Sequence, residues 1–261
     1  MMSKLRQSAF EPVGTSGADV RTWTRDYPAQ YLIPAHYHDR DQLVHASRGV
    51  MTVATGNATW VVPPRRAVWV PAGVSHEIAT SGVVEMRTLY LRARTVPRMG
   101  LNVVSVTPLL EELILEACRV GELHRRISRD RHLIALIIDQ LRGIQMVPLQ
   151  LPYPQDARAQ KVAHAILAYH EPGALEDLCD YAGASRRTIE RLFVSEVGMG
   201  LGRWRQQARL MHGMRLLAEG AKVSHAALEA GYATPSAFIS MFRKALGVTP
   251  TECFRSTLKS S

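Results

Sequence analysis

The sequence predicts two domains, an N-terminal domain of β-strands with flanking helices and a C-terminal domain made only of helices. Three observations predict this division. Residues 31–91 alternate short apolar runs with glycine and proline turns, residues 108–142 repeat apolar side chains at intervals of three and four, and the last hundred residues contain one short pattern twice. With 261 residues, of which 46% are hydrophobic and 21% charged, the chain is long enough for two globular domains.

The strand-like region predicts an antiparallel barrel or sandwich over about residues 25–95. Short apolar runs occur at residues 50–54, 59–62, 67–70 and 87–91. They are separated by turn residues, which include Gly56, Pro63, Gly73 and Gly82. Short strands at this spacing with such turns are typical of all-β domains.

Two amphipathic helices are predicted within residues 108–142, with Gly121 between them. The apolar stripe of the second helix consists of Leu133, Ile134, Ile137, Ile138 and Leu141. This stripe forms either a dimer seam or packing against the barrel. Residues 147–156 contain three prolines, and this composition predicts a stiff linker that resists both helix and sheet. The predicted domains are therefore residues 1–146 and 157–261.

The helical region repeats one unit at an interval of 49 residues, measured from Gly198 to Gly247. Each copy has a turn glycine, a hydroxyl N-cap and a terminal glycine, which are Gly183, Ser185 and Gly198 in the first and Gly231, Thr234 and Gly247 in the second. A short helix, a glycine turn, an N-cap and an amphipathic helix form a helix-turn-helix. We predict the two motifs at about residues 175–197 and 223–246, joined by a long helix at 201–219.

Charge and cysteine content narrow the class of function. The net charge of +9 and a pI near 9.8 favour a polyanionic partner, and six arginines lie between residues 183 and 209. The three cysteines have no CxxC spacing, so neither a disulfide framework nor a thiolate zinc site is predicted. The first ten residues lack an apolar run and no apolar stretch is long enough for a bilayer, so we expect a cytoplasmic protein without a membrane partner.

The segment from about residue 157 to 255 resembles the DNA-binding domain of the AraC/XylS family of bacterial transcription regulators. The run AGYATPSAFISMFRKALGVTP at residues 230–250 carries most of the resemblance. The chain departs from the family pattern at Cys179, Leu201, Ala226 and Cys253, where we expect changes in packing only. The resemblance implies double-stranded promoter DNA as the partner.

The resemblance also implies which residues contact DNA. The expected base-reading residues are Arg187, Glu190, Arg191, Pro235, Ser236 and Ser240, and those expected at the helix start or near phosphates are Arg186, Arg203, Thr234, Arg243 and Lys244. Because arginine can donate two hydrogen bonds to guanine, Arg187 and Arg191 are expected to specify bases, each by roughly 1 to 3 kcal/mol. Glu190 either accepts from cytosine or braces an arginine. The recognition helix of the second motif has small outward residues, so it is expected to discriminate only weakly between base sequences.

A histidine pattern marks the N-terminal region. The residues His36, His38, Gln42 and Gly49, followed by Pro71, Gly73 and His76, resemble the two cupin signatures, with glutamine replacing the usual glutamate and Arg65 replacing a glycine. In such a barrel the histidines are expected to converge, and with the Gln42 amide oxygen they could bind a divalent metal ion. Polar lining of a small-molecule pocket is the alternative. Trp60 and Trp69 are expected either to line that pocket or to belong to the core.

Together these features predict a transcription regulator and not an enzyme. An N-terminal cupin-like barrel with flanking helices senses a small-molecule effector and forms a homodimer, and a C-terminal all-helical domain with two helix-turn-helix motifs binds DNA and contacts RNA polymerase as an activator or repressor. The rival hypothesis is a cupin metalloenzyme with an accessory DNA-binding domain, which a metal triad would favour. An architectural DNA-bending protein is disfavoured, because a sensor barrel would have no purpose there.

Overall fold

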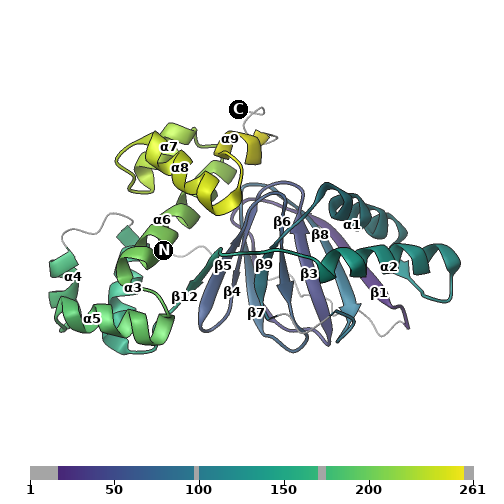
Figure 1. Cartoon of the computed structure of the whole chain (residues 1–261), viewed down its shortest axis with the longest axis horizontal. Helices are drawn as coiled ribbons and strands as arrows, with labels where there is room; N and C mark the ends of the chain where they lie inside the picture. Colours follow the sequence, from purple (N-terminus) through teal and green to yellow (C-terminus); the bar gives the residue numbers. More distant parts are fainter. Residues whose placement is uncertain (1–16, 97–99, 170–174, 256–261) are drawn as a thin grey trace.

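The computed structural model describes residues 17–96, 100–169 and 175–255. Within these ranges the chain forms an N-terminal β-domain with two flanking helices and a C-terminal helical domain, as predicted (Figure 1). The expectation that the first ten residues carry no leader segment lies outside the described residues. None of the helices in the described ranges combines the length and apolarity that crossing a membrane requires.

Two antiparallel sheets form the β-domain. Its strands are β1 (Val20–Tyr27), β2 (Leu32–His36), β3 (Arg40–Ala46), β4 (Val50–Ala54), β5 (Ala58–Val62), β6 (Arg66–Val70), β7 (His76–Ser81), β8 (Val84–Arg92), β9 (Asn102–Ser105), β10 (Glu122–Leu123), β11 (Met146–Val147) and β12 (Gln150–Pro152). One sheet has the order β10-β1-β8-β3-β6-β9-β11 and the other β12-β5-β4-β7-β2. The barrel therefore extends beyond the predicted residues 25–95 at both ends.

Alternation along the strands separates an inner face from an outer face. In β3, Leu43 and His45 point to one side and Gln42 and Val44 to the other, because successive strand residues alternate. Leu43 packs in the cluster that contains the flanking helices, whereas Val44 belongs to the other core cluster. Gln42 therefore faces the barrel interior, where the histidines also lie.

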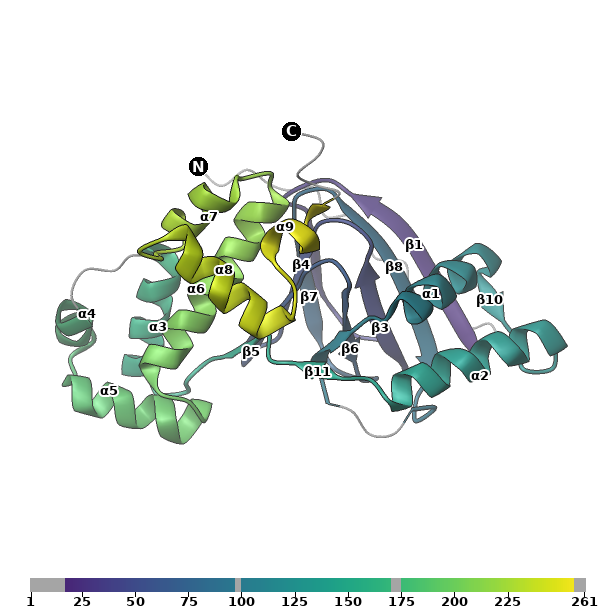
Figure 2. The ribbon, with the colours of Figure 1, turned by 45° about the horizontal axis from the view of Figure 1, so that its top comes forward.

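The helices α1 (Pro108–Val120) and α2 (Ser128–Arg142) cover the outer face of the seven-stranded sheet (Figure 2). The Thr107 hydroxyl caps α1 by accepting from the Leu110 N–H at 3.1 Å, and Pro108 lies in the first turn. The α2 stripe predicted from Leu133 to Leu141 is at most 8% exposed. It packs against the barrel and does not form a dimer seam.

The segment at residues 147–156 is partly sheet. The strand β11 pairs with β9, and β12 pairs with β5. The prediction that the prolines exclude sheet is therefore wrong. Both strands lie at sheet edges, where a proline such as Pro152 removes no interior ladder hydrogen bond. The connection between the domains is consequently fixed along the barrel.

The helical domain consists of α3 (Ala157–Tyr169), α4 (Leu175–Ala182), α5 (Arg186–Leu192) with a π-helical turn η1 (Phe193–Val197), α6 (Leu201–Ala218), α7 (Val223–Glu229), α8 (Pro235–Leu246) and α9 (Pro250–Cys253). The bounds of the two repeated units and of the connecting helix α6 agree with the predicted ranges to within two residues. The helix α6 lies between the two units in both views (Figures 1 and 2).

The connecting helix α6 also packs on the five-stranded sheet. Trp204 is buried and its Nε1 donates to the Pro152 carbonyl oxygen at 2.7 Å. In the turn between β7 and β8, a Cβ at Gly82 would lie 2.1 Å from the carbonyl oxygen of Ala218, so this turn touches the end of α6. One cluster of buried apolar residues runs from the barrel into α6. The two domains therefore share a core.

Candidate nucleic-acid interface and histidine cluster

The two repeated units have the same local geometry. The hydroxyls of Ser185 and Thr234 accept hydrogen bonds from the backbone N–H groups three residues later, at 3.3 and 3.2 Å. Each hydroxyl thereby satisfies a donor at the start of the helix that follows. The turn glycines Gly183 and Gly231 have φ of +70° and +76°, a conformation that glycine adopts without strain. Both units are therefore helix-turn-helix motifs, with α5 and α8 as their recognition helices.

The two recognition helices differ in their second halves. The helix α5 has seven residues before the π-helical turn, whereas α8 is helical over 12 residues. A π turn adds a residue to the helical repeat, so side chains after Leu192 leave the face on which Arg187 lies. The continuous helix predicted up to Val197 is therefore interrupted, and the regular α-helical part of the first recognition helix is limited to α5.

Two arginines dominate the exposed face of α5. Arg187 and Arg191 are exposed and four residues apart, so they lie on one side of the helix. Among the described residues neither forms an ion pair, whereas the neighbouring Arg186 pairs with Glu176 at 3.0 Å. Both guanidinium groups are therefore exposed on one side of the recognition helix.

Glu190 makes a contact that the sequence pattern does not predict. Its Oε2 accepts a hydrogen bond from the backbone N–H of Leu201 at 3.2 Å, and the residue is half-buried. Leu201 is the first residue of α6, where N–H groups lack partners within the helix, and the N-cap residue Gly200 has no side chain. The carboxylate therefore braces the connecting helix, a contact that neither of the two predicted roles includes.

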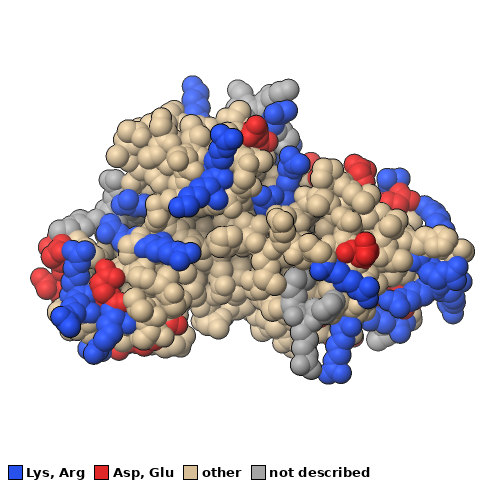
Figure 3. All heavy atoms as spheres, in the orientation of Figure 1, with Lys and Arg blue, Asp and Glu red and all other residues tan. Residues whose placement is uncertain are grey.

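The exposed face of α8 is less charged at its start. Ser236, Ser240, Arg243 and Lys244 are exposed, and Pro235 is half-exposed. An open groove of about 530 Å³ runs along this face. It is lined by Ser236, Ile239, Ser240, Arg243, Lys244 and Thr249. The Thr234 hydroxyl is engaged in capping. Figure 3 shows Lys and Arg side chains distributed over this side of the helical domain, and Arg203 in the first turn of α6 is likewise exposed.

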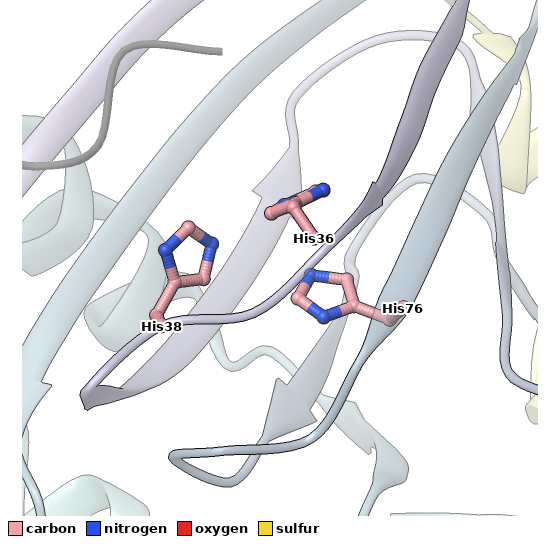
Figure 4. A group of neighbouring side chains, drawn as sticks. All are labelled: His36, His38 and His76. Atoms are coloured by element: carbon pink, nitrogen blue, oxygen red, sulfur yellow. The ribbon is translucent and has the colours of Figure 1, made fainter.

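Three histidines meet inside the barrel (Figure 4). His36 ends β2, His76 begins β7 directly opposite it, and His38 lies in the loop after β2. The ring centroids of His36 and His76 are 4.4 Å apart, and one ring nitrogen of each histidine lies within 4.8 Å of the others. The structure therefore brings together the three histidines that the sequence pattern indicates.

Backbone carbonyls set the orientation of two of these rings. Nδ1 of His36 lies 2.7 Å from the Pro34 oxygen, and Nδ1 of His76 lies 2.9 Å from the Val74 oxygen. A carbonyl oxygen only accepts, so Nδ1 carries the proton in both rings and Nε2 keeps its lone pair.

Burial keeps the imidazoles of this cluster neutral. It lowers the pKa of His38 to about 3, with a further contribution from His36 and His76, and it lowers the pKa of His76 to about 4. The pKa of His36 is lowered for the same reason. A neutral imidazole is the form that coordinates a metal ion.

Gln42 reaches the cluster through Tyr90. Its Nε2 donates to the Tyr90 hydroxyl at 3.1 Å, and the Tyr90 ring lies 4.8 Å from that of His38. The Gln42 Oε1 is buried and, among the described residues, accepts no hydrogen bond. The sequence pattern alone does not single out Tyr90. The signal lies in the strand register, which pairs Tyr90 with Gln42 and so places both on one face.

The two tryptophans have different environments. The ladder register places Trp60 on the same sheet face as His76. Trp69 instead pairs with Leu43 and packs in the cluster beneath α1 and α2. Of the two predicted roles of Trp69, the core position is confirmed and pocket lining is not, because its position in β6 turns it to the outer face. Trp60 stays a candidate for that lining.

Comparison with known proteins identifies both domains. A family model described as an AraC-like ligand binding domain matches residues 18–142, and a model described as a helix-turn-helix domain matches residues 178–256. The HTH-type transcriptional regulator NimR of Escherichia coli (strain K12) is 32% identical over 253 residues, covering 96% of this chain and 92% of NimR. The HTH-type transcriptional regulator RipA of Corynebacterium glutamicum is 32% identical over 102 residues, covering 39% of this chain and 30% of RipA.

Among solved structures, the DNA-binding domain of AdpA in complex with a target DNA is 32% identical, and the match covers 41% of this chain and 96% of that chain at a TM-score of 0.36. The alignment with NimR extends over nearly the whole of both chains. The two family models match the barrel with its helices and the helical region with both motifs, respectively. The chain therefore belongs to the family of AraC-type helix-turn-helix transcriptional regulators.

Proposed function

We propose that this DNA-binding transcription regulator reads its operator mainly through α5 and anchors itself on DNA through α8. The observation that carries the proposal is the contrast between the two exposed faces. Arg187 and Arg191 project from α5 without ion pairs among the described residues, whereas the first turns of α8 expose Ser236 and Ser240. Bidentate arginine contacts to guanine discriminate between bases, and serine contacts discriminate little. The family consists of regulators, so the rival metalloenzyme hypothesis has no support.

Selection of duplexes from a random library with the full chain tests this proposal. We expect a defined operator for the wild-type protein. The Arg191→Ala variant is expected to lose about 1 to 3 kcal/mol of binding free energy on the operator and much less on an unrelated duplex. Arg119→Ala on α1 serves as the charge-matched control. Equal losses on both duplexes would show that Arg191 contacts phosphate, and failure of the wild-type protein to select any sequence would refute the proposed function.

We also propose that His36, His38 and His76 hold a divalent transition-metal ion. Three neutral imidazoles without a carboxylate favour Zn²⁺, Ni²⁺, Co²⁺ or Cu²⁺ over Mg²⁺ and Ca²⁺. The carbonyls on Nδ1 of His36 and His76 are the outer partners that metal-binding histidines usually have. The Nε2 atom of His76 is buried and has no hydrogen-bond partner among the described residues, so it can serve as a metal ligand. The ion would supply a positive charge at the base of the effector pocket.

Elemental analysis of tag-free protein, dialysed against Zn²⁺ and then against buffer, tests the metal site. We expect about one ion per chain in the wild-type protein and loss of this ion in His38→Ala and His76→Ala. His225→Ala removes an exposed histidine of α7 and is expected to keep the ion. No stoichiometric metal in the wild-type protein would overturn the metal site and leave the histidines as polar lining.

A small-molecule effector is proposed to bind in the same part of the barrel. Gln42 and Tyr90 supply hydrogen-bonding groups next to the histidines, and Trp60 supplies apolar surface on the same side of its sheet. A few hydrogen-bonding groups beside apolar side chains are typical of small-molecule sites. A Gln42→Leu variant is expected to respond less to the effector in a reporter assay while binding operator DNA unchanged, and an unchanged response would remove Gln42 from the site.

A homodimer is proposed through the outer face of α2. Leu136 is 49% exposed there, next to a groove of about 600 Å³ whose charged lining includes Arg131, Asp139 and Arg142. Two copies related by a twofold axis can pair Asp139 of one with an arginine of the other. Leu136→Glu is expected to yield monomers by light scattering, whereas Leu109→Glu on α1, equally exposed, is expected to leave the dimer intact. A monomeric wild-type protein would refute the dimer.

Contact with RNA polymerase and a cytoplasmic location are proposed from the family. A regulator acts in the compartment that holds its promoter. An operator just upstream of the RNA polymerase binding site favours contact between the regulator and the polymerase. Footprinting relative to the transcription start tests this, because protection that overlaps the polymerase site would indicate a repressor instead.

A further inference from the structure

A basic cleft lies between α6 and the turn that precedes α8. We call it the inter-motif cleft. Its volume is about 440 Å³, and it is lined by Gly202, Arg205, Gln206, Arg209, Gly231, Tyr232 and Ala233. None of these lining residues is acidic. Arg205 and Arg209 therefore bring two guanidinium groups to a hollow whose own lining supplies no carboxylate.

The positive charge of the cleft extends toward α5. Burial lowers the pKa of Arg205, and the positive charges of Arg209 and Arg186 lower it further, so Arg205 lies close enough to each of them to be repelled. Arg186 pairs with Glu176, whereas within residues 17–96, 100–169 and 175–255 neither Arg205 nor Arg209 forms an ion pair. A guanidinium stays charged in proteins. The charge of the cleft is therefore left for an external anion.

The shape of the cleft depends on a glycine. Gly231 has φ of +76°, and a Cβ there would lie 3.0 Å from Nε of Arg209. The glycine therefore lets the Arg209 guanidinium lie directly against the turn, three residues before the N-cap of α8. Arg209 is half-buried, and the backbone at Gly231 restricts the position of its guanidinium group more than solvent would.

The cleft lies between the starts of both recognition helices. Ala233 immediately precedes Thr234, the N-cap of α8, and the positive charge of Arg186, the first residue of α5, contributes to the lowered pKa of Arg205. The N-terminal parts of recognition helices enter the major groove. When α5 and α8 occupy successive major grooves, the structure between them faces the sugar-phosphate backbone along the intervening minor groove. The helix α6 lies between the two motifs in Figures 1 and 2.

We propose that the inter-motif cleft binds backbone phosphates of the operator between the two major-groove sites, through the guanidinium groups of Arg205 and Arg209. This inference rests on the proposed function and adds a third contact region, which reads no bases. Arginine suits this role because its planar fork can donate two hydrogen bonds to phosphate oxygens. The contact sets the register of the two recognition helices on the duplex.

Salt dependence of binding distinguishes this contact from base reading. The full chain is titrated by anisotropy with the selected operator and with an unrelated duplex of the same length, at several salt concentrations. Arg205→Ala and Arg209→Ala are each expected to weaken binding to both duplexes by a similar factor and to reduce the slope of log K against log[salt] by about 1. Arg205→Lys keeps the charge and is expected to keep the slope, and Arg126→Ala, remote on the barrel side, is expected to change nothing.

Neutral linkages in the DNA identify the phosphates. An operator with methylphosphonates between the two half-sites is expected to bind the wild-type protein as weakly as the normal operator binds Arg205→Ala, and the two changes together are expected to cost little more than one. Unchanged slopes, or a loss confined to the operator, would overturn the proposal. Because Arg209→Ala can disturb the turn at Gly231, the thermal stability of each variant is measured as well. If Arg209→Ala is unfolded, the test of the proposal rests on Arg205→Ala. A wild-type protein that prefers no sequence would instead refute the proposed function.

Discussion

At Glu190 a carboxylate from the recognition helix takes the place of an N-cap side chain. Gly200 provides only backbone at the start of α6, and the Leu201 N–H donates to Glu190 instead. A contact of this kind depends on which chain segments meet in the folded protein. The sequence alone therefore does not predict it, and the place of Glu190 in the motif indicates only a role at the DNA. The histidines were predictable because strand alternation and one turn suffice to bring them together. Tyr90 was not, because its place follows from the register between β3 and β8.

Replacing Glu190 tests its bracing role. Glu190→Ala is expected to lower the free energy of unfolding by about 0.5 to 2 kcal/mol, as loss of an N-cap does, and to weaken operator and non-operator binding together. Glu190→Gln keeps an oxygen acceptor and is expected to retain most of the stability. Urea unfolding and a repeat of the duplex selection measure both effects. A changed base preference at one operator position would contradict the bracing role.

At the scale of elements, α6 and α8 approach closely because α6 contains a glycine at the crossing. A Cβ at Gly213 would lie 2.6 Å from Cε2 of the buried Phe238. The helices themselves were predictable, since caps, glycine stops and apolar spacing are local signals. The strands β11 and β12 and the π turn after Leu192 were not, because pairing at a sheet edge and a shift in helical repeat depend on the tertiary partner.

The glycines of α6 provide a matched pair of variants. Gly213→Ala is expected to destabilise the protein by about 1 to 3 kcal/mol, since the added methyl group displaces the Phe238 ring. Gly202→Ala lies in the same helix with open space around its Cβ and is expected to stabilise by up to about 1 kcal/mol. Thermal and urea unfolding measure the difference. Equal effects of the two substitutions would show that the crossing tolerates a methyl group.

At the scale of the whole molecule, the barrel contacts the end of a recognition helix. Nη2 of Arg66 in β6 donates to the carbonyl oxygen of Leu246, the last residue of α8, at 2.6 Å. The last carbonyls of a helix lack partners within it and carry partial negative charge, so a cation is favourable there. The order of the domains was predictable from composition. Their docking was not, because it joins residues 180 positions apart.

Removing the Arg66 side chain is expected to loosen this contact. In Arg66→Ala, backbone amides at the end of α8 and in α9 are expected to exchange hydrogen faster, while the barrel strands stay protected, and the free energy of unfolding is expected to fall by about 1 to 2 kcal/mol. Arg66→Lys keeps the charge, and its hydrogen exchange and free energy of unfolding are expected to lie between those of the wild-type protein and Arg66→Ala. Hydrogen exchange by mass spectrometry measures this, and unchanged exchange in α8 would show that other contacts hold the domains together.

The position of α6 between both motifs and the barrel sheet has a thermodynamic consequence. Because Trp204 and the end of α6 contact the barrel, the effector proposed to bind there is expected to change how α5 and α8 are positioned for DNA. Linkage then requires reciprocity: operator DNA must change the affinity for the effector by the same factor by which the effector changes the affinity for the operator. A calorimetric titration of effector into protein, with and without operator, therefore measures the regulatory coupling without any promoter.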